Sequence, residues 1–133
     1  MEKTFIMIKP DGVKRKLIGE VISRIERKGY QINQMKLFRP SRKLVENHYI
    51  EHRQRDFFSD LVDYIEGEAV VALEVEGENA IEVMRLLIGD KDPRQALPGT
   101  IRGDLANTLS QNIIHGSDSE ESALRELEIW FEQ

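Results

Sequence analysis

The sequence predicts an α+β fold in which helices pack on a four-stranded antiparallel β-sheet. Short apolar runs typical of strands alternate along the chain with segments of helical periodicity, so both kinds of element are expected around one sheet. The chain has 133 residues, which is enough for a single domain over residues 1–133 with one core. Apolar residues make up 40% and charged residues 32% of it, a balance typical of globular proteins.

The first part of the chain predicts two strands with a helix between them. Residues 5–8 form an uninterrupted apolar run that stops at Pro10, which is typical of a strand buried on both faces. Apolar residues then recur at helical spacing over residues 17–29, and the segment ends in a glycine. Over residues 30–37 the pattern alternates and changes phase near residues 33–34, which predicts a strand with a β-bulge.

The middle of the chain predicts three helices and one strand. A helix over residues 41–52 can be capped by its first residue, a serine, and a second helical stretch covers residues 57–65. Residues 69–75 are rich in β-forming residues and predict the third strand. A further helix follows over residues 79–89, where Asn79 and the glutamate three positions later resemble a capping box.

The last part of the chain predicts a long loop, a short strand and a final helix. Residues 89–104 contain two prolines, three glycines and no periodicity, and a loop of this length is more often functional than idle. A short strand ends at His115, and residues 123–131 carry the apolar face of a helix. The element order fits a ferredoxin-like βαββαβ arrangement with extra helices inserted between the second and third strands. These patterns leave the order of the strands open.

Composition narrows the classes of function. No apolar run approaches the roughly 20 residues that cross a bilayer, and residues 1–10 match no signal or transit peptide, so no membrane partner is expected. The chain has no cysteine, which excludes disulfides and thiolate chemistry and fits a reducing compartment. We therefore expect a cytoplasmic protein.

The charge balance is acidic overall but uneven along the chain. The net charge is −5, so no nucleic acid partner is expected. Residues 1–55 hold 14 basic and 6 acidic residues, whereas residues 56–133 hold 5 and 18. Because both halves are expected to interleave in one fold, an anion site must come from a few placed cations.

The segment NIIHGSDS, residues 112–119, places an imidazole where a buried strand ends and a helix is about to begin. A helix N-terminus favours a bound phosphoryl group and disfavours a protonated imidazole, and a neutral histidine can act as a nucleophile. Glu126, about two helical turns further on, can hydrogen-bond Ser117 or hold the ring of His115. Alternatively, the histidine only packs at the strand end, and residues 117–119 only cap the helix.

Candidate phosphate-binding cations stand at structural junctions. The chain has neither a GxxxxGK[ST] loop nor a GxGxxG motif, which disfavours a Walker-type nucleotidase. Lys9 follows the first strand, Arg85 lies on a predicted helix, and Arg102 lies in the glycine-flanked segment PGTIRGD. Guanidinium groups bind phosphate oxygens in a two-pronged manner. Each of these cations alone is typically a solvated surface residue.

The segment HYIEH, residues 48–52, matches the HxxEH pattern of inverted zinc metallopeptidases. On one helix, His48 and His52 would share a face, with Glu51 as the possible base. The simpler interpretation is that both histidines line a helix, partly packed and partly wet. A five-residue match without a third ligand gives the zinc hypothesis little weight.

Phe57 and Phe58 are adjacent, so on a helix they point about 100° apart and need not both enter the core. One of them could stack on a nucleobase. Otherwise both are core or interface residues.

These motifs together resemble the nucleoside diphosphate kinase family. The resemblance covers essentially the whole chain, from TFIMIKPDGVKR through HYIEH, DFF and PGTIRGD to NIIHGSDSEESALRELEIWF. NIIHGSDS together with PGTIRGD, in this order and at this spacing, is highly specific.

The resemblance implies a ferredoxin-like domain that self-associates into a homo-oligomer, either a tetramer or a hexamer. Its activity would be ping-pong transfer of the γ-phosphoryl group of a nucleoside triphosphate to a nucleoside diphosphate, with Mg²⁺ as cofactor. The nucleotide phosphates and water would hold the metal, with Asp118 nearby, so no direct protein ligand is expected.

The resemblance also implies roles for single residues. His115 matches the histidine that is phosphorylated, and Ser117 and Glu126 match the pair that orients it. The positions that match family residues around the phosphates and the sugar are Lys9, Tyr49, Arg85, Arg102 and Asn112, with Lys9 and Tyr49 also expected to assist catalysis. Phe57 matches the aromatic residue on which the base stacks, and Leu109 falls where an apolar residue covers its other face. Stacking tolerates every base, so broad specificity is expected.

The chain departs from the family pattern at three places. Lys91 stands close to the phosphates where members usually carry threonine, and it would add a charge to the nucleotide site. Residues 67–69 replace a usual Ser-Gly-Pro turn. The chain ends at Gln133 without the C-terminal extension of many members, which leaves the size of the oligomer open. The alternative function is a non-catalytic nucleotide-binding or interaction module on the same fold.

Overall fold

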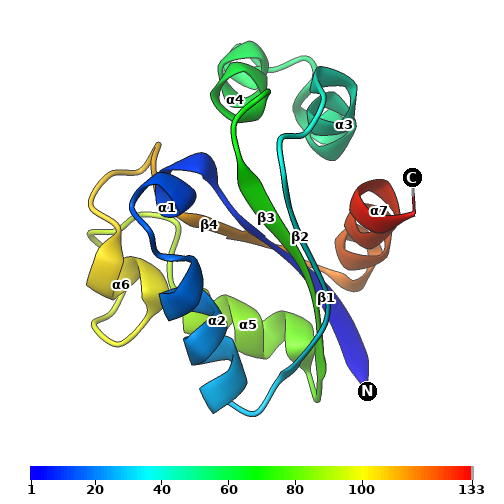
Figure 1. Cartoon of the computed structure of the whole chain (residues 1–133). Helices are drawn as coiled ribbons and strands as arrows, with labels where there is room; N and C mark the ends of the chain where they lie inside the picture. The colour runs from blue at the N-terminus through cyan, green and yellow to red at the C-terminus, as the bar shows by residue number, and fades with distance from the viewer. Residues whose placement is uncertain (133) are drawn as a thin grey trace.

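The computed structural model describes residues 1–132, which form a single four-stranded antiparallel sheet flanked by helices (Figure 1). The strands are β1 (Glu2–Ile8), β2 (Gln31–Phe38), β3 (Val70–Gly77) and β4 (Ile114–Gly116). Their order across the sheet is β2-β3-β1-β4, and each neighbouring pair is antiparallel. The predicted ferredoxin-like α+β class is confirmed, and the structure supplies the strand order.

Helices cover both faces of the sheet. They are α1 (Pro10–Lys14), α2 (Ile18–Arg27), α3 (Arg42–His48), α4 (Phe58–Ile65), α5 (Ala80–Ile88), α6 (Ile101–Leu105) and α7 (Glu120–Phe131), with a 3₁₀ turn η1 (Ile50–His52). In Figure 1, α2 and α5 lie on one face, and α3, α4 and α7 lie on the other. None of the helices within residues 1–132 is long and apolar enough to cross a membrane.

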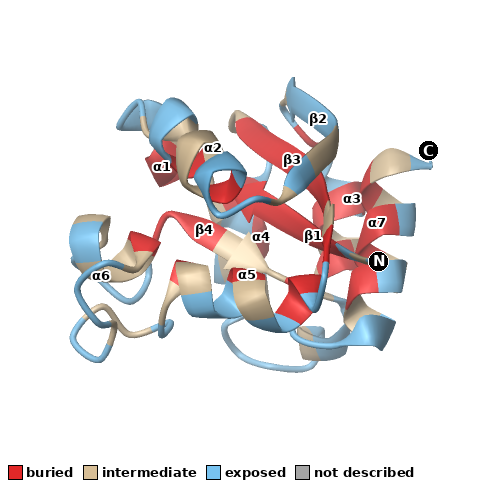
Figure 2. Cartoon of the chain, turned by 90° about the horizontal axis from the view of Figure 1, so that it is seen from below, coloured by how far each residue is buried: buried red, intermediate tan, exposed pale blue. Residues whose placement is uncertain are grey.

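The central strand β1 separates two apolar cores. Ile6 and Ile8 pack with α2 and α5, whereas Phe5 and Met7 pack with α3, α4 and α7. All four side chains are fully buried, and Figure 2 draws most of β1 in red, the colour of buried residues. This alternation follows from the two-residue period of a strand. It confirms the prediction that the first strand is buried on both faces.

Two local predictions are confirmed in detail. The pairing of β2 with β3 shifts between Ile32 and Gln34, which is the predicted bulge. Ser41 caps α3, because its hydroxyl accepts a hydrogen bond from the backbone N–H of Leu44 at 3.2 Å. The predicted insertion of helices between the second and third strands corresponds to α3, η1 and α4.

The predicted capping box of α5 is wrong. Asn79 lies in the left-handed region at φ 49° and makes no side-chain cap, so it cannot pair with Glu82 in that motif. Instead, a carboxylate oxygen of Glu2 accepts a hydrogen bond from the N–H of Ile81 at 2.9 Å. The helix is therefore capped by a residue 79 positions away, which no local pattern encodes.

The predicted helix over residues 41–52 and the predicted loop over residues 89–104 also need correction. The first helix ends at His48 and continues only as the 3₁₀ turn η1. The second segment ends in α6, where the Thr100 hydroxyl accepts from the N–H of Gly103 at 2.9 Å. A Cβ at Gly103 would stand 2.0 Å from the Leu97 carbonyl oxygen, so this tight turn requires glycine.

Candidate active site

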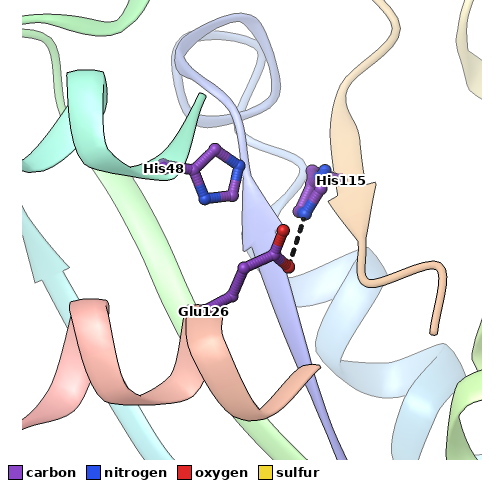
Figure 3. Close-up of side chains that lie close together, drawn as sticks. All are labelled: His48, His115 and Glu126. Atoms are coloured by element: carbon purple, nitrogen blue, oxygen red, sulfur yellow. Dashed lines mark hydrogen bonds and ion pairs between the residues drawn. The ribbon is translucent and has the colours of Figure 1, made fainter. Parts of the chain in front are cut away.

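The imidazole of His115 forms the centre of the site. His115 lies in β4, paired with Met7 of β1, and its side chain is 24% exposed. Its Nε2 lies 3.0 Å from Oε1 of Glu126, which projects from α7 and is 5% exposed (Figure 3). The predicted histidine and carboxylate are therefore brought into direct contact.

Glu126 also binds Ser117, whose hydroxyl donates to the same oxygen at 2.5 Å. Burial opposes ionisation of this carboxyl, but hydrogen bonds from His115 and Ser117 hold the pKa of Glu126 below its usual range. A carboxylate only accepts hydrogen bonds, so Nε2 of His115 must carry the proton. The lone pair of a neutral His115 is then on Nδ1, away from Glu126.

A pocket of about 290 Å³ opens beside this ring. It is lined by His52, Arg85, Ile88, Gly89, Lys91, Arg102, His115, Gly116 and Asp118. Three of these side chains are cations and one is a carboxylate. A larger hollow of about 760 Å³ borders the pocket along α5 and shares Arg85, Gly89 and Asp118 with it, but His115 does not line it. The smaller pocket is therefore the better candidate site, because it contains the imidazole.

Arg102 is tied to the backbone around the pocket. It donates to the Ile114 carbonyl at 2.6 Å and to the Gly89 carbonyl at 3.1 Å. Burial lowers the pKa of Arg102 to about 10, and repulsion from Arg85 is the second-largest cause of this shift. Carbonyl dipoles position this guanidinium without neutralising it, so its charge remains available for an anion.

Lys9 and Asn112 form a second layer behind the pocket. The Lys9 ammonium donates to Oδ1 of Asn112 at 2.9 Å, and the Asn112 amide donates to the Lys91 carbonyl at 3.0 Å. Burial, followed by repulsion from Arg102, lowers the pKa of Lys9 to about 8. Lys9 thus belongs to the same cationic cluster, although it does not line the pocket.

The backbone that precedes His115 is held in an unusual conformation. Ile113 has φ 75°, a region that a β-branched residue rarely adopts. Oδ2 of Asp11 accepts a hydrogen bond from the N–H of Ile113 at 3.0 Å, and the N–H of Lys9 donates to the Ile113 carbonyl at 2.7 Å. Sequence reasoning missed Asp11; the only available signal was an acidic residue directly after the proline that ends the first strand.

The remaining predicted site residues are Tyr49, Phe57 and Leu109. Tyr49 packs edge-on against His48, with ring centroids 4.7 Å apart, and burial followed by the charge of Glu126 raises the pKa of its hydroxyl. Phe57 is 45% exposed and Leu109 is 59% exposed. Neither lines the 290 Å³ pocket, but the ring of Phe57 packs against that of the pocket-lining His52, with centroids 5.5 Å apart.

The zinc peptidase pattern is not realised. His48 ends α3 and His52 lies in η1, so the two histidines do not share one continuous helical face. The ligand atoms of His48, His115 and Glu126 lie within 4.8 Å of one another, but Nδ1 of His48 already accepts a hydrogen bond from Trp130 at 3.0 Å. A neutral histidine has a single ring lone pair, so His48 has none left for a metal in this arrangement.

The fold and the site define a class of protein: a ferredoxin-like domain with a carboxylate-bound histidine beside a cationic pocket, an arrangement suited to phosphorylated ligands. The family model described as nucleoside diphosphate kinase matches residues 2–133. The chain therefore belongs to the nucleoside diphosphate kinase family.

Individual relatives agree with this assignment. The chain is 57% identical to a nucleoside diphosphate kinase of Exiguobacterium sibiricum, over 99% of this chain and 96% of the relative. It is 55% identical to one of Archaeoglobus fulgidus, over 98% of this chain and 87% of the relative. The crystal structure of an apo nucleoside diphosphate kinase from Encephalitozoon cuniculi superimposes with a TM-score of 0.96 at 42% identity, covering 100% of this chain and 90% of that one. The crystal structure of a nucleoside diphosphate kinase family protein from Babesia bovis gives a TM-score of 0.97 at 44% identity, covering 98% of this chain and 88% of that one.

Proposed function

We propose that this chain is an active nucleoside diphosphate kinase that carries the phosphoryl group on His115. The observation that carries the proposal is the bond between Nε2 of His115 and Glu126. It leaves Nδ1 as the unprotonated nitrogen of a partly exposed ring beside a cationic pocket.

In the first half-reaction, Nδ1 of His115 attacks the terminal phosphorus of a nucleoside triphosphate. The Nδ1–P bond forms, the bond from phosphorus to the bridging oxygen breaks, and the nucleoside diphosphate leaves with the bonding electron pair. The ring becomes positively charged, and the Glu126 carboxylate stabilises that charge through the Nε2 proton. In the second half-reaction a terminal oxygen of another nucleoside diphosphate attacks the same phosphorus, and Nδ1 regains its lone pair.

The cations supply the electrostatic part of this mechanism. Negative charge spreads over the transferred phosphoryl group, and fixed positive charges stabilise it without reorganisation. Arg85, Arg102 and Lys91 line the pocket, and Lys9 stands behind them. The N-terminus of α7 contributes less than the sequence suggested, because its first turn begins five residues after His115 and carries Glu120 and Glu121.

The pocket also fits a Mg²⁺ ion bound to the nucleotide. Asp118 is the pocket's one lining carboxylate, and a hydrogen bond from Ser122 lowers its pKa, so it is ionised at neutral pH. One carboxylate suits an ion that keeps most of its water and binds mainly to phosphate oxygens. When bound, Mg²⁺ would neutralise phosphate charge, with Asp118 as an outer partner.

Nucleoside binding would use Phe57 and Leu109, in agreement with the family resemblance. Both side chains are exposed, which leaves their apolar surfaces available to the two faces of a base. Stacking on a π-face tolerates every base, so broad specificity belongs to the proposal.

Self-association and a cytoplasmic location are also part of the proposal. β2 is an edge strand, and its Met35 and Leu37 side chains are exposed. An uncovered edge with apolar residues favours pairing with another copy. Light scattering would distinguish a tetramer from a hexamer, and cell fractionation would test the location.

The decisive experiment is phosphoryl labelling without an acceptor. Incubation with γ-labelled ATP and Mg²⁺ should attach a label that is acid-labile and alkali-stable, and the His115→Ala variant should take up none. Absence of label from the natural chain would reject the proposal. Tight diphosphate binding without any transfer would instead favour a non-catalytic nucleotide-binding module.

A further inference from the structure

A second histidine, His48, lies against the ring of His115, and the mechanism above does not use it. It ends α3, whereas His115 and Glu126 come from β4 and α7, and the three side chains converge in Figure 3. The His48 side chain is buried, and its ring centroid lies 4.7 Å from that of His115 at an interplanar angle of 78°. The contact has the edge-to-face geometry that aromatic pairs favour.

Trp130 fixes the tautomer of His48. The indole N–H of this fully buried tryptophan donates to Nδ1 of His48 at 3.0 Å. An indole nitrogen only donates, so Nδ1 must be the unprotonated nitrogen and Nε2 carries the proton. Burial, followed by repulsion from His115, lowers the pKa of His48 to about 3, so the ring is neutral whenever its neighbour reacts.

The contacts of His115 leave its ring little freedom. Phe5 lies 5.9 Å from the ring of His115 and 5.9 Å from that of His48, and it stacks on Trp130 at 5.4 Å. A 180° rotation of the His115 ring would take Nε2 away from Glu126, because it would place the carbon atoms Cε1 and Cδ2 where Nε2 and Nδ1 now lie. The buried aromatic side chains around the ring oppose that rotation, because rearranging a closely packed interior costs free energy.

We propose that His48 is a positioning residue for phosphoryl transfer: held by Trp130, it keeps the ring of His115 in the orientation that places Nε2 on Glu126 and leaves Nδ1 free to react. The inference rests on the proposed function, but the orientation of the ring can be measured without any reaction. His48 acts through His115 and touches no substrate.

The first test uses ¹⁵N-histidine labelling of the natural chain, whose spectrum contains only three histidines. At neutral pH, His48 should show a protonated Nε2 and a bare Nδ1, and the neutral form of His115 should show the same pattern. A cationic His48, or a His48 protonated on Nδ1, would overturn the proposal. This measurement needs no variant and no substrate.

The second test replaces His48 by asparagine. The amide oxygen of asparagine can take the place of Nδ1 and still accept from Trp130, but the part of the ring that touches His115 is lost. His115 should then show a mixture of tautomers, and its phosphorylation should be about three- to tenfold slower with KM little changed. Phe38→Leu is the matched control, because Phe38 packs on Trp130 with ring centroids 5.7 Å apart but does not belong to the His115 contact.

The outcomes separate positioning from general packing. A His48→Asn protein with a wild-type His115 spectrum and a wild-type kcat would overturn the proposal, whatever its melting temperature. If this variant does not fold, Trp130→Phe provides the test, because it keeps the His48 ring and removes its donor. His48 should then sample both tautomers, and a single Nε2-protonated form would contradict the role of Trp130. If the natural chain takes up no phosphoryl group, the proposed function fails, while the tautomer measurements still decide the role of His48.

Discussion

Arg102 donates a hydrogen bond to the backbone carbonyl of Ile114 at 2.6 Å, so a cation of α6 is tied to the residue that directly precedes His115. The same guanidinium binds the Gly89 carbonyl, which follows α5. One side chain therefore joins three segments at the pocket. These hydrogen bonds to neutral carbonyl groups fix the position of the Arg102 charge.

Arg102→Ala should weaken nucleotide binding and slow transfer together, because its charge acts on the phosphates in both the ground state and the transition state. Removing a charge-assisted hydrogen bond to phosphate should lower kcat/KM roughly 10- to 100-fold. Steady-state kinetics together with ADP titration would measure both effects. Arg39→Ala, which removes a guanidinium bound to the Gly67 carbonyl outside the pocket, is the control. A loss confined to kcat would contradict this assignment.

His115→Ala should abolish transfer and leave ADP affinity within about twofold, because a nucleophile contributes little to ground-state binding. Calorimetric titration and a coupled transfer assay would compare the two quantities. Comparable losses of binding and transfer would argue against His115 as the nucleophile.

Lys91→Thr should reduce the salt dependence of nucleotide binding. The substitution removes one of the three cations that line the pocket, and attraction between exposed charges is screened by salt. The ratio of ADP dissociation constants at low and high KCl should fall in this variant. Lys28→Thr changes the net charge equally outside the pocket lining, and it should keep the wild-type ratio.

Asp11→Asn should destabilise the fold by about 1–3 kcal/mol. The carboxylate accepts from the N–H of Ile113 and from the hydroxyl of Tyr64, and an amide offers one acceptor and one donor in place of two acceptors. Urea unfolding would measure the change. Tyr64→Phe removes only one of the two donors and should cost less. Equal losses in both variants would mean that the bond to Ile113 carries no stability of its own.

The free energy of unfolding should depend on pH through the ionisation of Lys9. Its pKa is about 8 in the folded chain and 10.5 when unfolded, so between these values the unfolded state binds the extra proton. The contribution of Lys9 to the free energy of unfolding therefore rises with pH across this window. Urea unfolding of the natural chain and of Lys9→Met, measured from pH 7 to 10.5, would give the difference between their free energies of unfolding. This difference should show the rise. A flat difference would contradict the burial of the ammonium group.

Sequence patterns over a few neighbouring positions predicted the features that depend only on interactions between nearby residues. The burial of β1, the bulge of β2 and the Ser41 cap all follow from residue spacing over a few positions. The pair His115 and Glu126 was also predictable, since a strand, a turn and a helix separate them by only eleven residues.

Contacts between distant segments escaped prediction. The bond from Ile113 to Asp11 spans 102 residues, and the bond from Trp130 to His48 spans 82. Both depend on which strands become neighbours, and the sequence left that order open. The helix α1 has only five residues, too few to show a helical period. A periodicity of apolar residues also could not reveal that α3 stops at His48.

The strand order has a consequence for how the protein is made. In chain order, β1 comes long before its edge partner β4, and α7, which carries Glu126, follows both. A nascent chain that extends only as far as β4 can thus pair β1 with β3 while the imidazole of His115 has no Glu126 carboxylate to bind. The contact between His115 and Glu126 can therefore form only after α7 has been synthesised.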